Sequence, residues 1–235
     1  MWKHLKPVII FCFLLLSSCN RNADKYSSWQ VYGGSKENIH YSSLTQIDTS
    51  NVEKLQVAWI YHTQDADTAN HSQIQCNPII VDSTLYGTSP QLKLFAINAI
   101  TGKQKWIFNP VDTIGSSKNI FVLNNIRGIT FWTDGKSARR LFYTAGSYLY
   151  SIDGVNGKPD KDFGIDGKID LHEGLDREVK DLFVTATSPG IIYKDLITMG
   201  TRVDEGPVAA PGHIRAYDVR TGKRKWIFHT IPFPG

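Results

Sequence analysis

The sequence predicts an all-β fold of the β-propeller class. One short phrase occurs three times, at 96–103, 151–158 and 216–223, and each copy ends in Gly-Lys. The glycines are Gly102, Gly157 and Gly222, so the copies stand 55 and 65 residues apart. No stretch shows the apolar periodicity of an amphipathic helix of normal length. A strand–turn–strand unit repeated at such a period is typical of propeller blades, and the chain has room for about three of them.

Each copy of the phrase has the composition of a hairpin. In the first, 94–97 is a short apolar strand, and the Asn that follows can hydrogen-bond the next backbone groups to start a turn. The glycine supplies the positive φ that a tight turn needs. The first and third copies continue identically as Lys-Trp-Ile-Phe, at 105–108 and 225–228, which we interpret as the returning strand. The middle copy differs, because Lys158-Pro159 interrupts the return and Phe163 stands near the place of the Trp.

Other short apolar runs around turn residues predict further strands. The segment 49–55 has the residues of a short capped helical turn, and 56–62 alternates in the manner of a strand. The long, polar, Gly-rich segment 160–180 is expected to be an excursion on one face of the propeller. Paired runs that we interpret as strands are 78–81 with 84–87, 141–144 with 148–150, and 190–193 with 196–199; two further apolar strands, 120–122 and 129–132, flank Arg127-Gly128.

The N-terminus has the features of an export signal. Lys3, His4 and Lys6 precede nine apolar residues at 8–16. This run is too short to span a bilayer as a mature helix but has the length of a secretory signal. It ends Leu-Ser-Ser-Cys, which resembles the bacterial lipobox. We therefore expect a signal peptide over 1–18, acylation of Cys19, a lipidated tether over 19–27, and an exported, periplasm-facing lipoprotein anchored to the membrane. Ordinary signal cleavage with an incidental Cys is the alternative.

Composition argues against several other classes of protein. The net charge of +4 is small and dispersed, so nucleic acid is not expected as a partner. Beyond residue 19 the chain has one cysteine, Cys76, so no disulfide is expected within the mature domain. The sequence shows no Gly-rich phosphate loop and no Cys/His metal spacing. Its seven histidines are scattered, and each is expected to be a surface or strand residue.

Three polar features stand at the ends of predicted strands, near the axial mouth where propellers bind ligands. Arg127-Gly128 lies between two apolar strands, where a charge needs a partner or a ligand. Asp204-Glu205 follows the strand at 196–199, and a carboxylate there could bind a cation. Gln75 shortly precedes the strand at 78–81. Each feature also fits an ordinary structural salt bridge or turn.

These motifs together resemble those of the pyrroloquinoline quinone (PQQ)-dependent dehydrogenases. The resemblance covers 28–235. It rests on the repeat, on Trp-x-x-Tyr-Gly-Gly at 29–34, on Asn-Val-x-x-Leu-x-x-Ala-Trp at 51–59, and on Gln75, Arg127, Thr187 and Glu205 occurring in that order. It implies an eight-bladed propeller, locked by Trp docking motifs, of which 28–235 would be the N-terminal part. It also implies that Gln75, Arg127 and Thr187 contact PQQ and that Glu205 binds Ca²⁺, which polarises the reactive carbonyl of PQQ as a Lewis acid.

Departures from the family pattern narrow the expected substrate. The vicinal Cys pair that alcohol-oxidising members carry before the Arg-Gly is absent, and 120–123 is apolar. This points toward the glucose-dehydrogenase-like branch, with a sugar or polyol as substrate and a membrane quinone or cytochrome as electron acceptor. Gln91 stands where that branch has a substrate-linked His. Because the family's catalytic Asp comes later in its sequence, we expect this chain to be an N-terminal fragment that has no turnover alone.

A second class of propeller is the alternative. Lipoproteins of outer-membrane protein assembly carry similar repeats and act as binding scaffolds without a cofactor. The set Gln75, Arg127, Thr187 and Glu205 favours the enzyme, because a scaffold has no need for these side chains at axial strand ends.

Overall fold

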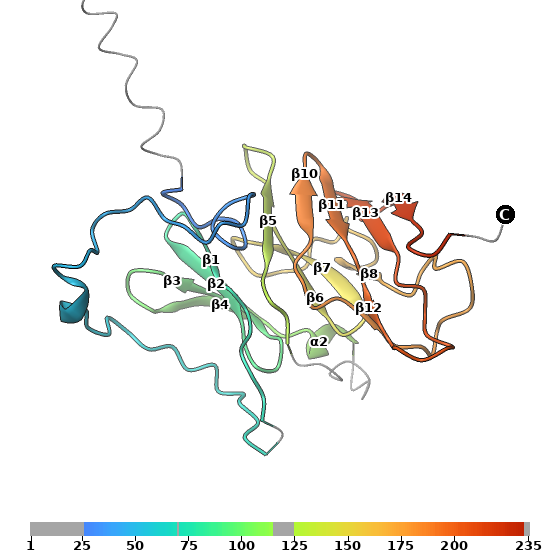
Figure 1. The fold of residues 1–235 in the computed structure, drawn as a ribbon, viewed down its shortest axis with the longest axis horizontal. Helices are drawn as coiled ribbons and strands as arrows, with labels where there is room; N and C mark the ends of the chain where they lie inside the picture. Colours follow the sequence, from blue (N-terminus) through green and yellow to red (C-terminus); the bar gives the residue numbers. More distant parts are fainter. Residues whose placement is uncertain (1–25, 70, 115–124, 233–235) are drawn as a thin grey trace, which may run out of the picture.

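Three four-stranded antiparallel sheets stand side by side in chain order (Figure 1). This computed structural model describes residues 26–69, 71–114 and 125–232. We call the sheets blades 1, 2 and 3. Blade 1 contains β1 (Ile79–Val81), β2 (Thr84–Thr88), β3 (Leu94–Asn98) and β4 (Gln104–Phe108). Blade 2 contains β5 (Thr130–Thr133), β6 (Arg139–Ala145), β7 (Tyr148–Asp153) and β8 (Lys168–Asp170). Blade 3 contains β10 (Ile191–Tyr193), β11 (Leu196–Met199), β13 (Ile214–Asp218) and β14 (Arg224–Phe228). The predicted all-β architecture of three repeated units is confirmed.

The remaining elements are short. Strand β9 (Val184–Thr185) pairs with β12 (Arg202–Val203). The helices of the described part are a 3₁₀ turn, η2 (Val52–Lys54), where the capped turn was predicted, and α2 (Val111–Ile114). None of these described helices has the length and apolar character needed to cross a membrane. The predicted signal peptide (1–18), Cys19, most of the tether and the strand at 120–122 lie outside the described residues.

Apolar cores fill the spaces between neighbouring blades. One cluster of buried residues joins blade 1 to blade 2 and includes Ile79, Leu94, Leu141 and Tyr150. The other joins blade 2 to blade 3 and includes Phe142, Phe163, Ile197 and Tyr217. Because each blade buries its faces against the next, the blades depend on one another for stability.

The repeated phrase forms the turn that follows the third strand of each blade. The Oδ1 atom of Asn98 accepts hydrogen bonds from the backbone N–H groups of Ile100 and Thr101 at 2.9 and 3.0 Å. In the other two turns, Oδ1 of Asp153 and Oδ1 of Asp218 accept hydrogen bonds from the N–H groups two and three residues later in the same way. The three glycines lie at φ of +69°, +73° and +71°, where a residue without Cβ has no steric cost. The predicted turn chemistry is therefore present in all three copies.

Tryptophan rings dock onto these turns from the preceding segment of chain. Trp59 covers Gly102 and donates its Nε1–H to a carbonyl of that turn at 3.2 Å. Trp106 of β4 covers Gly157 of blade 2 and donates to the Gly154 carbonyl at 3.2 Å. A Cβ on Gly102 or Gly157 would meet indole atoms at 2.7 or 2.6 Å. Glycine is therefore required for the docking as well as for the turn.

Blade 2 makes a different connection to blade 3. The excursion at 160–180 supplies β8, the fourth strand, in place of the interrupted return. Phe163 is fully buried, and the Gly164 N–H donates to the Thr221 carbonyl of the blade 3 turn at 3.0 Å. The buried guanidinium of Arg140 donates to the carbonyls of Val219 and Arg220 at 3.1 and 2.7 Å and to both carboxylate oxygens of Asp162 at 2.9 Å. At the blade 3 turn, the loop at Phe163 and Gly164 and the Arg140 guanidinium thus make the contacts that a docked Trp makes at the other two turns.

The segment 56–62 is not a strand, so this prediction was wrong. It has no ladder partner among the described residues, and Val57 and Ile60 are 77% and 69% exposed. Trp59 docks onto blade 1, and the Tyr61 ring lies against Phe95 with centroids 4.9 Å apart. Of the alternating apolar positions, Trp59 and Tyr61 contact blade 1, whereas Val57 is exposed.

Candidate functional site

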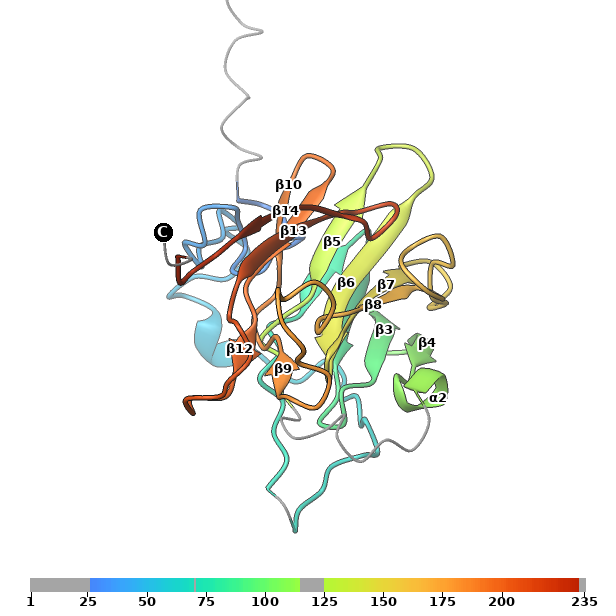
Figure 2. The same ribbon diagram turned by 90° about the vertical axis from the view of Figure 1, so that its right-hand side faces the viewer.

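A short backbone ladder joins the three blades where their first strands begin. The Asn77 N–H donates to the Arg127 carbonyl at 2.8 Å, and the Arg127 N–H donates to the Thr187 carbonyl at 2.8 Å. Asn77 and Gly128 form an isolated parallel bridge. These residues precede β1, β5 and β10, and Figure 2 shows β5 and β10 side by side. The structure therefore brings Arg127 and Thr187 together and places Gln75 two residues from the same ladder.

The opening Trp-x-x-Tyr-Gly-Gly motif packs against this ladder. Tyr32 lies so close to Gly128 that a Cβ there would meet the Tyr32 ring at 2.5 Å and Pro189 at 3.4 Å. The Trp29 ring covers Gly34 in the same way, and the Trp29 carbonyl accepts the Ile80 N–H of β1 at 2.9 Å. Gly128 thus allows the N-terminal segment and blade 3 to approach the backbone beside Arg127 on both sides.

The side chains at the ladder differ in exposure. Arg127 is exposed, and its guanidinium has neither a carboxylate nor a hydrogen-bond partner within the part of the chain that the structure describes. Gln75 is exposed and donates to the Gln73 side chain at 2.9 Å, whereas Thr187 is half-buried. A cationic fork without a counter-charge at the junction of three blades is suited to binding an anionic ligand.

Glu205 lies apart from these residues. β9 and β12 are antiparallel, with Thr185 opposite Arg202 and Val184 opposite Val203. Thr187 follows one end of this pair and Glu205 follows the other, so the register separates them. Glu205 is exposed, and its backbone N–H donates to the neighbouring Asp204 carboxylate at 2.9 Å. The structure therefore does not bring the predicted cation ligand to the predicted cofactor residues.

Thr201 is a buried polar residue beside this site that was not predicted. Continuing the β9–β12 register places Thr201 opposite Ala186, so its side chain lies on the core-facing side of this pair with Ala186, and the Thr187 side chain lies on the other side. Its hydroxyl oxygen is buried and has no hydrogen-bond partner among the described residues. Such a group is costly unless a ligand or water satisfies it. A threonine at a strand end carries no signal in the sequence, and only the pairing of β9 with β12 identifies it.

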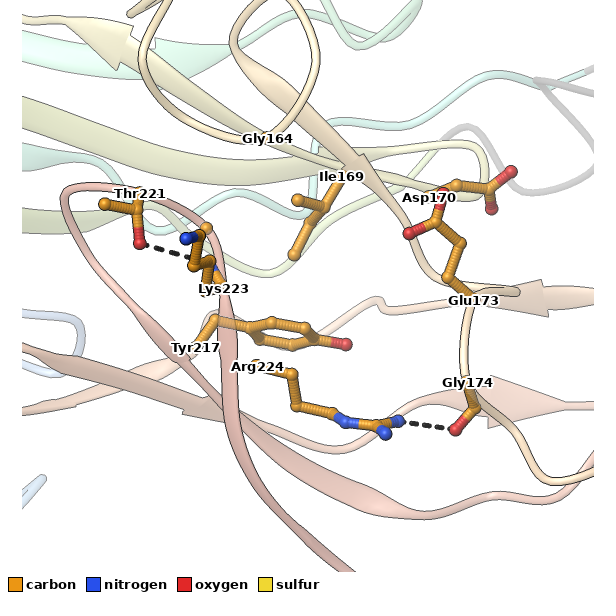
Figure 3. Close-up of a pocket in the computed structure, with 10 residues that line it drawn as sticks. Gly164, Ile169, Asp170, Glu173, Gly174, Tyr217, Thr221, Lys223 and Arg224 are labelled. Atoms are coloured by element: carbon orange, nitrogen blue, oxygen red, sulfur yellow. Dashed lines mark hydrogen bonds between the residues drawn. The ribbon is translucent and has the colours of Figure 1, made fainter.

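A surface cavity of about 500 Å³ lies elsewhere, between β8 and the turn of blade 3 (Figure 3). Its lining includes Asp170 and Glu173 on one side and Lys223 and Arg224 on the other, and Arg224 donates to the Gly174 carbonyl. The lining contains none of the predicted site residues. The cavity is therefore separate from the ladder, and its lining carries two acidic and two basic side chains.

Comparison with known proteins assigns the fold to a family. Residues 29–234 match the family model of the PQQ glucose/ethanol/alcohol dehydrogenase β-propeller domain. The chain belongs to this family. Among quinoprotein relatives, the glucose dehydrogenase of Gluconobacter oxydans is 33% identical over 221 residues, which are 86% of this chain and 27% of that protein. The quinate/shikimate dehydrogenase (quinone) of Acinetobacter baylyi is 31% identical and covers 88% of this chain and 28% of that protein.

Solved structures agree with this assignment. The quinohemoprotein alcohol dehydrogenase of Comamonas testosteroni superposes with a TM-score of 0.71 at 25% identity, covering 90% of this chain and 28% of that one. This quinoprotein propeller chain therefore spans little more than a quarter of the length of the relatives it matches. Membership of the family favours the dehydrogenase over the scaffold alternative.

The residues at the ladder fit the cofactor of this family. PQQ is a carboxylated ortho-quinone, and the site offers an Arg127 guanidinium without a counter-charge among the described residues. Arg127 would hold a carboxylate, and Thr187 and Gln75 would hold further oxygens. The donor set matches the chemistry of the ligand.

Proposed function

We propose that the protein carrying this chain is a PQQ-dependent dehydrogenase that oxidises a sugar or polyol and passes the electrons to a membrane quinone or a cytochrome. The observation that carries the proposal is the ladder from Asn77 through Arg127 to Thr187, which presents the Arg127 guanidinium at the junction of three blades. Relatives described as dehydrogenases of glucose, quinate/shikimate and glycerol support the substrate class.

Each residue at the ladder has a distinct task in this proposal. Bound PQQ supplies the electron-accepting quinone that the side chains of the protein lack. Arg127 orients the cofactor because a guanidinium binds a carboxylate through two parallel hydrogen bonds. Tyr32, packed on Gly128, fixes the backbone that carries Arg127 and fills the space beside it.

We further propose Glu205 as a Ca²⁺ ligand, with Asp204 beside it. Carboxylate oxygens are the ligands that calcium prefers. Because β12 directs Glu205 away from Thr187, this role requires the exposed segment after Val203 to fold back toward the ladder. Glu205→Gln should then raise the Ca²⁺ concentration needed for half-maximal dye reduction, while an unchanged Ca²⁺ requirement would remove Glu205 from the site.

The test of the cofactor site is PQQ binding by the purified full-length protein, measured by fluorescence titration. Losing a hydrogen-bonded charge partner costs about 1.5–3 kcal/mol, so Arg127→Ala should weaken PQQ binding about 10- to 150-fold. Thr187→Val, which removes the hydroxyl of the residue hydrogen-bonded to Arg127 through the backbone, should also weaken binding. Arg220→Ala is the control, because Arg220 is an exposed arginine that pairs with Asp195 at the far turn of blade 3.

Two outcomes would overturn the proposal. Equal PQQ affinity in Arg127→Ala and Arg220→Ala would remove Arg127 from the cofactor site. Failure of the PQQ- and Ca²⁺-loaded protein to reduce a dye with any aldose, polyol or quinate would refute the dehydrogenase itself. The substrate panel extends beyond glucose because Gln91 replaces the expected His.

We also propose that the protein is exported and anchored to the membrane through lipid on Cys19. The support is the order Leu-Ser-Ser-Cys after an apolar run of signal length. Labelled palmitate should be incorporated by cells expressing the native protein and not by cells expressing Cys19→Ser. Equal labelling of both would refute the anchor.

A further inference from the structure

Two histidines and an aspartate gather at the open ends of β13 and β14, the last two strands of blade 3. The Nε2 atom of His213 lies 3.2 Å from Oδ2 of Asp176, and Nδ1 of His229 lies 3.1 Å from the same oxygen. The donor atoms of the three residues all lie within 4.8 Å of one another. The two imidazole rings meet edge to face with centroids 4.6 Å apart.

The register of blade 3 creates this cluster. Ile214 of β13 pairs with Phe228 of β14, so the next positions outward, His213 and His229, face each other across the hairpin. Cross-strand neighbours share one face of the sheet, which explains the contact of the rings. Asp176 comes from the separate excursion between blades 2 and 3. The cluster therefore joins the β13–β14 hairpin to the earlier excursion that carries Asp176.

Blade 1 provides an internal comparison. Leu94 pairs with Phe108 there, so the positions equivalent to the two histidines are Lys93 and Asn109. Lys93 also meets a carboxylate, with Nζ 3.6 Å from Oδ2 of Asp65. In blade 1 this corner is thus an ion pair between lysine and carboxylate. Blade 3 also has a carboxylate at this corner, but its two strand positions carry imidazoles. Imidazole nitrogens are common metal ligands, whereas Lys and Asn side chains rarely bind metals.

We propose that Asp176, His213 and His229 bind a divalent transition-metal ion of the zinc class. Zinc binds imidazole nitrogen and carboxylate oxygen at about 2.0–2.1 Å in tetrahedral geometry, so its ligand atoms stand about 3.3 Å apart. The separations of 3.2 and 3.1 Å are close to that edge length. All three donor atoms lie within 4.8 Å of one another, so binding would set the remaining separation, between the two imidazole nitrogens.

The donor set favours zinc over calcium or magnesium. A hard cation needs six or more oxygens, and this cluster offers one carboxylate. Arg215, two residues along β13, is fully buried and places a positive charge on the same strand, which further disfavours a purely ionic site. Bonds from two imidazoles offset that repulsion for a transition metal. The Asp176 side chain is 35% exposed, so a water molecule can take the fourth position.

A bound ion would hold the outer corner of blade 3 together. It would fasten the excursion between blades 2 and 3 to the first residue before β13 and the first residue after β14. Since the three donors come from different elements, binding requires the folded blade, and the ion should stabilise it.

The experiment uses the purified full-length protein after removal of metal with a chelator. Co²⁺ is added first, because four-coordinate Co²⁺ shows strong visible absorption, and Zn²⁺ is then titrated to displace it. Asp176→Asn and His229→Asn are the test variants, and both change side chains that are partly exposed at the surface. His62→Asn is the matched control, since His62 is an exposed histidine of the segment before blade 1. PQQ binding, which depends on Arg127, is measured in parallel.

We expect one tetrahedral Co²⁺ per chain in the parent protein and in His62→Asn, and displacement by Zn²⁺ with a rise in melting temperature. Loss of a residue that only orients a ligand weakens metal binding about 10- to 100-fold, so loss of a ligand should weaken it by more than about 100-fold. The absence of tetrahedral Co²⁺ in the parent, or equal binding in Asp176→Asn, would show a cluster held by hydrogen bonds alone. Because PQQ binding is read separately, failure of the metal site leaves the cofactor proposal intact.

Discussion

Gly157→Ala is the sharpest test of how the blades are locked together. Gly157 closes the blade 2 turn at a φ of +73°, and Trp106 of blade 1 lies directly over it. A methyl group there would stand 2.6 Å from two atoms of the indole. The ring must therefore move away, since real Cβ atoms do not approach so closely.

The expected loss of stability has three parts. Alanine in the left-handed region costs about 1–2 kcal/mol. Displacing the indole gives up the 3.2 Å hydrogen bond from Trp106 to the Gly154 carbonyl, which contributes about 1 kcal/mol. Partial exposure of the Trp106 ring, of which only 9% is now accessible, adds about 1 kcal/mol. The sum is about 3–4 kcal/mol, carried by the inter-blade contact and the turn together.

Urea unfolding followed by far-ultraviolet circular dichroism measures this loss. Gly135→Ala is the matched control, because Gly135 has a φ of +77° and no atom within 4 Å of the place that the added methyl group would take. It should lose only the backbone part, about 1–2 kcal/mol. Equal losses in the two variants would refute the docking argument. In a Trp106→Ala background, Gly157→Ala should cost no more than Gly135→Ala does.

Two further predictions concern the turn of blade 3 and the residues that hold it. Arg140→Lys should destabilise the protein by about 2–4 kcal/mol, because an ammonium cannot hold Asp162 and two carbonyls at once; urea unfolding equal to that of the parent would contradict this. Burial raises the pKa of Asp218, but hydrogen bonds from Thr221 and the Arg220 N–H outweigh it and hold the pKa below its ordinary 3.8. A depressed pKa stabilises the fold above 3.8 and loses that effect as the pH falls through the lower folded value. The melting temperatures of parent and Asp218→Asn should therefore differ at neutral pH and converge below pH 3.8; a constant difference would refute the assignment.

The sequence predicts local turns better than the contacts that depend on register. The Asn or Asp before each turn and the glycine at its end are visible as a repeat, because hairpin chemistry is confined to a few neighbouring residues. The alternation at 56–62 predicted a strand wrongly, since the same pattern arises when an extended chain docks onto a blade without pairing.

The candidate functional residues also fall into two groups, those predicted from motifs and those that only strand pairing brings together. Arg127 and Thr187 could be proposed from motifs, and the structure joins them through one backbone ladder. The pair His213 and His229 could not be found, because these two residues meet only through the pairing of β13 with β14. The histidines are scattered along the sequence, yet these two meet in the fold.

The docked tryptophans also bear on the order in which the protein folds. Trp59 is 40 residues from its acceptor carbonyl and Trp106 is 48 residues from its own, so each blade contact closes over a modest stretch of chain. In both cases the acceptor follows the ring in chain order. A blade can therefore be completed as soon as the next turn has emerged, and contacts of limited sequence separation form quickly. During synthesis the chain can thus assemble its blades progressively, because each indole contacts a turn that follows it in the sequence.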